Sequence, residues 1–100
     1  MPRFLVTYHG QGMPDDPAMM EAAKAAFVAW VAEAGDAIID PGAPLHMVRQ
    51  VASGQATPPA EIGGYSIIEA DSPHSAAAVL KSHPYVGRGG TLQINEILAV

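Results

Sequence analysis

The chain contains no cysteine and no long apolar run. Without cysteine it forms no disulfides, thiolate nucleophiles or thiolate zinc sites, and this composition fits a reducing compartment, so we expect a cytoplasmic protein. No stretch approaches the roughly 18 consecutive apolar residues of a membrane span. The start of the chain reaches Tyr8, His9 and Gly10 too soon to contain the apolar core of a signal peptide. We therefore expect no membrane partner.

The chain is also poor in positive charge. Five Lys and Arg residues stand against ten Asp and Glu residues, which gives a net charge of −5. Binding to a phosphate backbone requires clustered cations that release counterions, and no cluster is present, so we expect no nucleic-acid partner. The basic residues are scattered: Arg3, Lys24, Arg49, Lys81 and Arg88.

Apolar residues, in contrast, are abundant. They make up 49% of the 100 residues, and charged residues make up only 15%, where about 25% is typical. A single domain of this size buries only about two-thirds of the surface of its unfolded chain. Burial against a second copy would absorb the excess, so we expect a homodimer. The alternative is that alanine accounts for the excess and lies on the surface of a monomer.

The first half of the chain predicts a strand, a helix and a second strand. Arg3–His9 is rich in β-branched and aromatic residues, as strands are, and Gly10 to Pro14 breaks it. Asp16 and Pro17 form a helix start, and Gly35 forms the stop, which predicts a helix from Pro17 to Ala34. Its apolar stripe comprises Met20, Ala23, Phe27, Trp30, Val31 and Ala34. The second strand is expected over Asp36 to Asp40, interrupted by Pro41 to Pro44.

The second half repeats this order. Leu45 to Val51 is expected to be an extended continuation or a short strand, and Ser53 to Pro59 a surface hairpin loop. Gly64 to Ala70 predicts a strand. Ser72 and Pro73 start a second helix that Pro84 ends at His83, with Ala76, Ala77, Val79 and Leu80 on its buried side. Gly87 to Gly90 turns the chain into a last strand, Thr91 to Leu98.

This order predicts an α+β fold in which two helices cover one face of an antiparallel sheet. Alternation places Phe4, Val6 and Tyr8 on one side of the first strand, and we expect that apolar side to meet the helices. The opposite face of the sheet is mixed, and it suits either a wet interface or a solvent surface.

Four segments at their observed spacing carry a family resemblance: Phe4–Gly10, Gly35–Gly42, Gly64–Ser72 and His83–Ile97. Together they resemble the YCII-related (DGPF-like) family over nearly the whole chain. The resemblance implies a ferredoxin-like βαββαβ fold whose sheets pair into a dimeric α/β barrel. Some members are thought to use a His–Asp pair, with the His early in the first helix and the Asp in an Asp-Pro after the second. Here those positions read Ala23-Lys24 and His83-Pro84, so the pair is not carried over.

Three residues are candidates for acid or base catalysis. His83 lies at the predicted helix end where the family pattern places an acid, and a histidine titrates near neutral pH; alternatively, a charged His83 is simply favoured by the helix dipole. His9 ends the first strand beside a loop, or is an ordinary polar strand end. Asp40 could pair with a histidine across the sheet, or it only favours the turn at Pro41-Gly42.

Four further residues are candidates for ligand binding. Tyr8 is expected to be a hydrogen-bond partner, and His46, Arg49 and Arg88 could bind an anion or a carboxylate. Arg88 lies among glycines whose backbone N–H groups can form an anion nest, but the segment lacks the Gly-Lys-Ser/Thr ending of a phosphate loop. The four histidines have no metal-ligand spacing, so we expect no metal or other cofactor.

Two functions remain open. The absence of the family's His–Asp pair favours a dimeric module that binds a small molecule or serves as an accessory protein. The alternative is a cofactor-free enzyme that acts on a small organic molecule, with His83 or His9 transferring the proton and Tyr8 as its hydrogen-bond partner.

Overall fold

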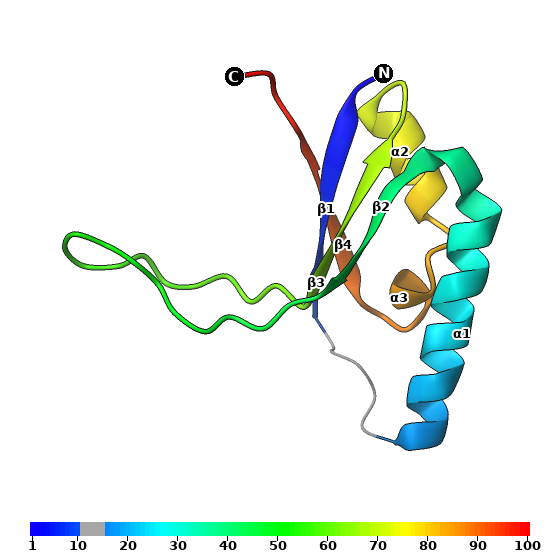
Figure 1. The fold of residues 1–100 in the computed structure, drawn as a ribbon, viewed down its shortest axis with the longest axis horizontal. Coiled ribbons are helices and arrows are strands. Elements are labelled where there is room, and N and C mark those ends of the chain that lie inside the picture. Colours follow the sequence, from blue (N-terminus) through cyan, green and yellow to red (C-terminus); the bar gives the residue numbers. More distant parts are fainter. Residues whose placement is uncertain (11–15) are drawn as a thin grey trace.

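The structure, a computed structural model, describes residues 1–10 and 16–100. The predicted break after the first strand lies, from Gln11 onward, outside the described residues. Four strands form one antiparallel sheet in the order β2-β3-β1-β4. They are β1 (Arg3–His9), β2 (Ile38–Pro44), β3 (Gly64–Glu69) and β4 (Thr91–Glu96). The helices α1 (Pro17–Ala34), α2 (Pro73–Leu80) and α3 (Pro84–Gly87) lie on the same side of this sheet (Figure 1).

The core lies between the sheet and the helices. Phe4 and Val6 of β1 and Ile68 of β3 are fully buried, and Trp30 of α1 and Leu80 of α2 pack against them. Each such side chain contributes roughly 1.5–3 kcal/mol when it is removed from water. The predicted alternation in β1 is confirmed, because the side that carries Phe4 and Val6 is the side that meets the helices.

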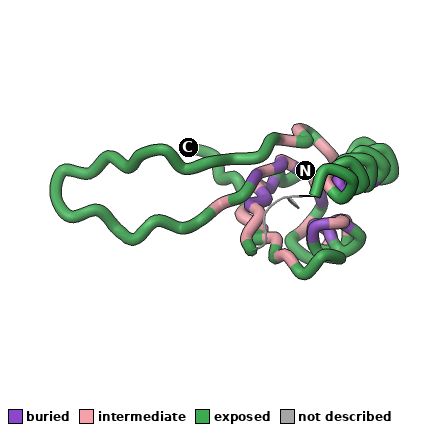
Figure 2. The backbone as a smooth tube through the Cα atoms, turned by 90° about the horizontal axis from the view of Figure 1, so that it is seen from below, coloured by how far each residue is buried: buried purple, intermediate pink, exposed green. Residues whose placement is uncertain are grey.

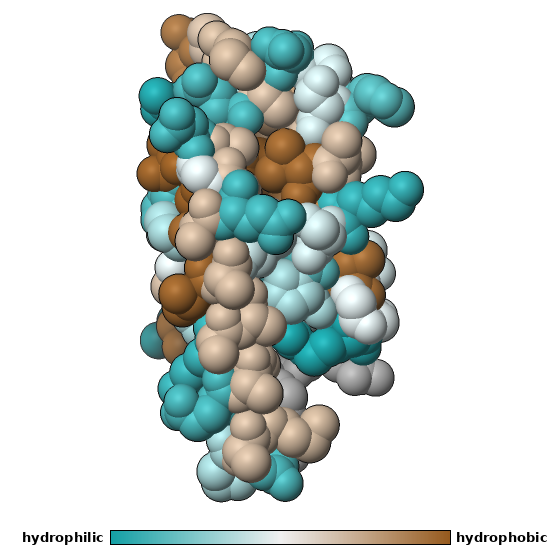
Figure 3. Space-filling model, turned by 90° about the vertical axis from the view of Figure 1, so that its right-hand side faces the viewer, coloured by the Kyte–Doolittle hydropathy of each residue, from teal (hydrophilic) through white to brown (hydrophobic). Residues whose placement is uncertain are grey.

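The local sequence signals predicted both ends of α1 correctly. The Asp16 carboxylate accepts a hydrogen bond from the Ala18 N–H at 2.8 Å, and Gly35 ends the helix with φ +57°. Of the predicted stripe, Ala23 and Trp30 are buried, and the other members are partly buried. Figure 3 views this side of the molecule, where a tan band of moderately hydrophobic side chains is exposed. The exposed alanines of α1 include Ala22, Ala25, Ala26, Ala29 and Ala32.

The second strand differs from its prediction at both ends. Asp36 and Ala37 belong to a short 3-10 helix (Gly35–Ala37), and β2 continues through Pro41-Gly42 to Pro44. Proline is tolerated here because β2 is an edge strand and its pairing with β3 shifts register between Asp40 and Ala43. The bulge absorbs the two residues that were expected to interrupt the strand.

Residues 45–63 form a long projecting segment, which we call the arm. Its root is held by the Leu45 N–H, which donates to Gly63 O, and by the Gly63 N–H, which donates to Tyr8 O. Of the two alternatives for Leu45 to Val51, an extended continuation or a short strand, the short strand is wrong, because the segment has no regular secondary structure. The predicted Ser53 to Pro59 loop is the exposed tip of the arm. The arm leaves the sheet on the side opposite the helices, and almost all of it is exposed (Figure 2).

The second helix is shorter than predicted. The Ser72 hydroxyl accepts from the Ser75 N–H as expected, but α2 ends at Leu80 and a separate helix, α3, begins at Pro84. The residue before a proline avoids the α region, and His83 accordingly is extended, with ψ 131°. Ala77 is exposed rather than buried, and β4 ends at Glu96 rather than Leu98. Within the described parts of the chain, none of the helices combines the length and apolar character needed to cross a membrane.

Candidate functional site

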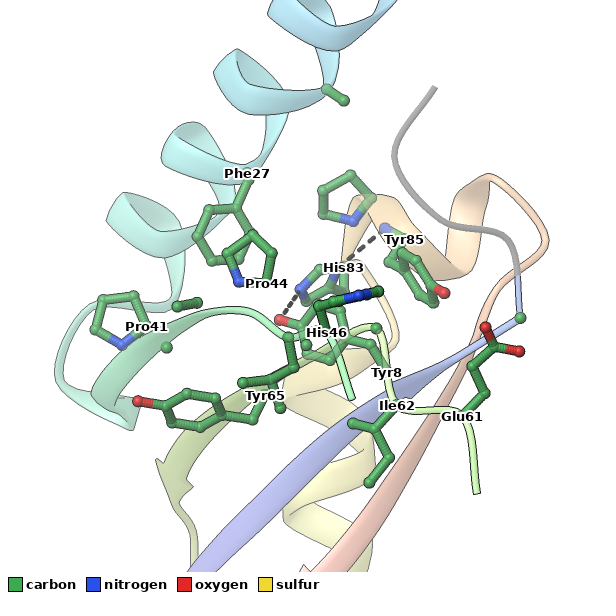
Figure 4. Close-up of a pocket in the computed structure, with 18 of the residues that line it drawn as sticks. Tyr8, Phe27, Pro41, Pro44, His46, Glu61, Ile62, Tyr65, His83 and Tyr85 are labelled. Atoms are coloured by element: carbon green, nitrogen blue, oxygen red, sulfur yellow. Dashed lines mark hydrogen bonds between the residues drawn. The ribbon is translucent and has the colours of Figure 1, made fainter. Parts of the chain in front are cut away.

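A cleft of about 950 Å³ opens between α1, the end of β2, the root of the arm and the segment that carries α3 (Figure 4). Its walls are mostly apolar, with aromatic and proline side chains from all four parts. Its lining includes Tyr8, Lys24, Phe27, Val28, Pro44, His46, Glu61, His83, Tyr85 and Arg88. The volume is within the range of small-molecule sites, about 300–1,000 Å³.

His83 lies in this cleft and is only 2% exposed. Its Nδ1 accepts a hydrogen bond from the Tyr85 N–H at 3.0 Å, which caps α3. A backbone N–H can only donate, so Nδ1 must be unprotonated. The neutral imidazole therefore carries its proton on Nε2, and the Nε2–H is left to donate to the Tyr8 hydroxyl at 2.8 Å.

The direction of this bond sets the direction of the next two. Tyr8 accepts from His83 and donates its own proton to Ser66 Oγ at 2.7 Å. The Ser66 hydroxyl then donates to the carbonyl of Pro41 at 2.8 Å. This series of hydrogen bonds ends at the β2 bulge, where Pro41 lies between the register pairs Asp40↔Ile67 and Ala43↔Tyr65. Each hydroxyl donates once, so all three side chains are satisfied in the buried interior.

Aromatic rings surround the imidazole. Ring centroids lie 4.3 Å from His83 for Trp30, 5.1 Å for Tyr8 and 5.6 Å for Phe27. Burial, and to a smaller extent the charge of Arg88, lower the pKa of His83 from 6.5 to about 4. Burial also raises the pKa of the Tyr8 phenol, against a smaller opposing effect of its hydrogen bond with Ser66. Both groups are therefore neutral at physiological pH.

The cleft brings together four of the seven residues singled out from the sequence: Tyr8, His46, His83 and Arg88. Arg49 lies on the exposed arm and does not line the cleft. His83 does not stand at a helix C-terminus as the dipole interpretation requires, because α2 has already ended and His83 caps the start of α3.

His9 and Asp40 lie apart from His83. His9 Nε2 is 2.8 Å from the Thr7 hydroxyl, and its Nδ1 is 3.1 Å from Glu61 O. Alternation along β1 puts His9 on the face away from Tyr8, so the two neighbours do not share a site. Asp40 accepts from the Gly42 N–H at 2.9 Å and from the Tyr65 hydroxyl at 3.2 Å. No histidine pairs with Asp40 among the described residues. Its hydrogen bond with the Gly42 N–H is the contact expected from the turn interpretation.

Neither Ser66 as a site residue nor the packing of Phe27 and Trp30 beside His83 was predicted from the sequence. Ser66 is 0% exposed and occupies an inward position of β3. The other inward positions of this strand are Gly64 and Ile68, which carry no polar side chain. A polar residue in such a row requires a buried partner. That signal was available, but the identity of the partner was not.

The arrangement suits recognition better than base catalysis. His83 Nδ1 is occupied by the Tyr85 N–H, and Nε2 already carries the proton, so the neutral ring has no free lone pair to take a proton from a ligand. Among residues 1–10 and 16–100, no three His, Asp or Glu side chains come together in a group that could hold a metal ion. Comparisons with protein-family models, with curated proteins and with solved structures found no match to this chain.

Proposed function

We propose that the protein is a binding or accessory module that holds a small, largely apolar organic molecule in the cleft. The observation that carries this proposal is the combination of a large apolar cleft with a histidine whose two ring nitrogens are both used inside the protein. Aromatic and proline walls favour flat or cyclic hydrocarbon groups. The hydrogen-bonded chain through Tyr8 and Ser66 stiffens one wall, which lowers the entropic cost of binding.

Binding of the neutral dye Nile red tests this proposal. We expect saturable fluorescence enhancement that is weakened about fivefold by Val28→Glu, because a charge at the apolar rim opposes binding of an uncharged ligand by about 1 kcal/mol. Val28 is 66% exposed, so the change should leave folding intact. Met19→Glu is the matched control, since Met19 is 58% exposed on the same helix and does not line the cleft. Equal weakening by both variants, or no saturable binding, would contradict the proposal.

A second candidate is a cofactor-free enzyme that acts on a small organic molecule by acid or base chemistry. The observation in its favour is that His83 and Tyr8 lie hydrogen-bonded to each other within the cleft. The Nε2–H would then have to leave through Tyr8 during turnover. If the protein turns over hydrolysis, dehalogenation or oxygenation substrates and His83→Ala abolishes that turnover, the protein is this enzyme rather than a binding module.

We further propose that the chain works as a homodimer of the YCII-related, ferredoxin-like type. The element order β1-α1-β2-β3-α2-β4 supports a βαββαβ fold. The helices leave one sheet face open, and the arm projects on that same side (Figure 1). On the arm Val48 is 84% exposed and Val51 is 97% exposed. A second copy seated on the open face would cover the face and the arms together.

Light scattering of the purified chain tests the dimer. We expect twice the chain mass for the wild type and a shift toward the single-chain mass for the double variant Val48→Lys/Val51→Lys, because the added charges would be buried without partners. Met19→Lys, on the opposite side of the molecule, should leave the mass unchanged. A wild type that stays monomeric at its highest soluble concentration would contradict the dimer proposal, and the proposed binding function of the cleft would stand.

A further inference from the structure

The cleft concentrates positive charge in an acidic protein. Lys24 and Arg88 line it and Glu61 is the single acidic residue that does, although acidic residues outnumber basic ones ten to five in the whole chain. The described residues of the cleft therefore carry a net positive charge while the protein carries −5. Such a local reversal of sign favours an anionic ligand.

Arg88 is the better placed of the two cations. Its guanidinium carbon lies 5.7 Å from the centroid of the Tyr85 ring, which supports the side chain from one side. Its backbone N–H closes the end of α3, so the base of the side chain is anchored. Within the described part of the chain the one ion pair joins Arg3 and Glu69, so no carboxylate there forms an ion pair with Arg88. The guanidinium charge also reaches the interior of the cleft, where it helps to lower the pKa of His83.

We propose that the ligand of the cleft is a small aromatic carboxylate, with its ring against the apolar walls and its carboxylate on Arg88. Arginine binds carboxylates through two parallel hydrogen bonds, a geometry that its planar fork favours. Lys24 on α1 adds a second positive charge to the same cleft. A phosphate ester is disfavoured, because residues 87–90 lack the Gly-Lys-Ser/Thr ending of a phosphate loop and lead into the strand β4 rather than into a helix. This inference rests on the proposed binding function of the cleft.

Displacement of Nile red by cinnamate and by cinnamamide tests the charge requirement, since the two compounds share the ring and side chain and differ in carboxylate against neutral amide. Near neutral pH we expect cinnamate to displace the dye at about tenfold lower concentration than cinnamamide, as one charge-assisted pair is worth about that factor. Arg88→Gln should reduce this ratio to nearly one, and Lys24→Gln should reduce it partly. Concentrated salt should shrink it in the wild type.

Arg49→Gln is the matched control, because Arg49 is exposed on the arm and does not line the cleft. It should leave the ratio unchanged. If both compounds displace the dye equally, or if Arg88→Gln keeps the ratio, the carboxylate proposal is overturned while the apolar binding site stands. If Nile red does not bind the wild type, the proposed function itself fails, so the two failures are distinguishable.

Discussion

Replacing Gly42 with alanine should cause the largest loss of stability of any substitution proposed for this protein. A Cβ atom at this position would lie 1.6 Å from the carbonyl oxygen of Tyr65, and Gly42 has φ +79°. The obstacle is backbone rather than a flexible side chain, so relief requires the bulge of β2 to separate from β3. We expect a loss of at least about 4 kcal/mol, the upper range for single substitutions, from a total that is typically 5–15 kcal/mol.

The same separation should disturb the cleft. The Pro41 carbonyl accepts from Ser66, and the Asp40 carboxylate accepts from the Gly42 N–H, so the bulge holds the end of the hydrogen-bonded chain. Urea unfolding followed by circular dichroism measures the loss. Gly54→Ala is the control, because a Cβ there meets nothing within 4 Å, and it should change stability by less than about 0.5 kcal/mol. A Gly42→Ala protein as stable as the control would show that the bulge does not have this geometry.

Replacing His83 with alanine should produce the second largest loss. The side chain is 2% exposed, packs on Trp30, caps α3 and is the donor to Tyr8. Its removal leaves a cavity, and it also leaves the Tyr85 N–H without its acceptor. We expect a loss of about 3–4 kcal/mol. His74→Ala, on the exposed first turn of α2, should cost less than about 0.5 kcal/mol.

The pH dependence of stability distinguishes the neutral, hydrogen-bonded His83 from a side chain that only fills space. The pKa of His83 is about 4 in the folded protein and 6.5 for the free side chain. The unfolded chain therefore binds more protons between these values, so stability is full above pH 6.5 and falls as the pH is lowered toward 4. We expect the wild type to lose about 3 kcal/mol through His83 between neutral pH and pH 4. The unfolding free energies of wild type and His83→Ala should therefore converge at acid pH; parallel curves would contradict a neutral, buried His83.

The secondary structure was largely predictable because its signals are local. Asp16 with Pro17 and Ser72 with Pro73 start helices through contacts with residues two or three positions away. The alternation of Phe4 and Val6 identified the buried face of β1. The predictions failed where contact with a segment distant in sequence overrode a local sequence signal. Pro41-Gly42 has the composition of a strand break, yet β2 continues through it because β3 lies alongside and accommodates the bulge.

The candidate site was predictable only in part. Tyr8, His46, His83 and Arg88 were recognised as chemically capable residues, and all four line one cleft. Their grouping was not apparent, because Tyr8 is 75 positions from His83 and 58 from Ser66. His9 and Tyr8 are neighbours in sequence, but the period of two along a strand sends them to opposite faces.

By itself, the sequence determined the element order, the helix starts, the inward face of β1 and the scarcity of positive charge, since these depend on residue type and short spacing. Only the tertiary structure decided which ring nitrogen of His83 carries the proton. That assignment follows from a backbone N–H on one side of the ring and from Tyr8 on the other, and Tyr8 reaches His83 because β1 lies between β3 and β4 beneath the helices. Burial then holds the ring neutral, because water no longer stabilises its charge.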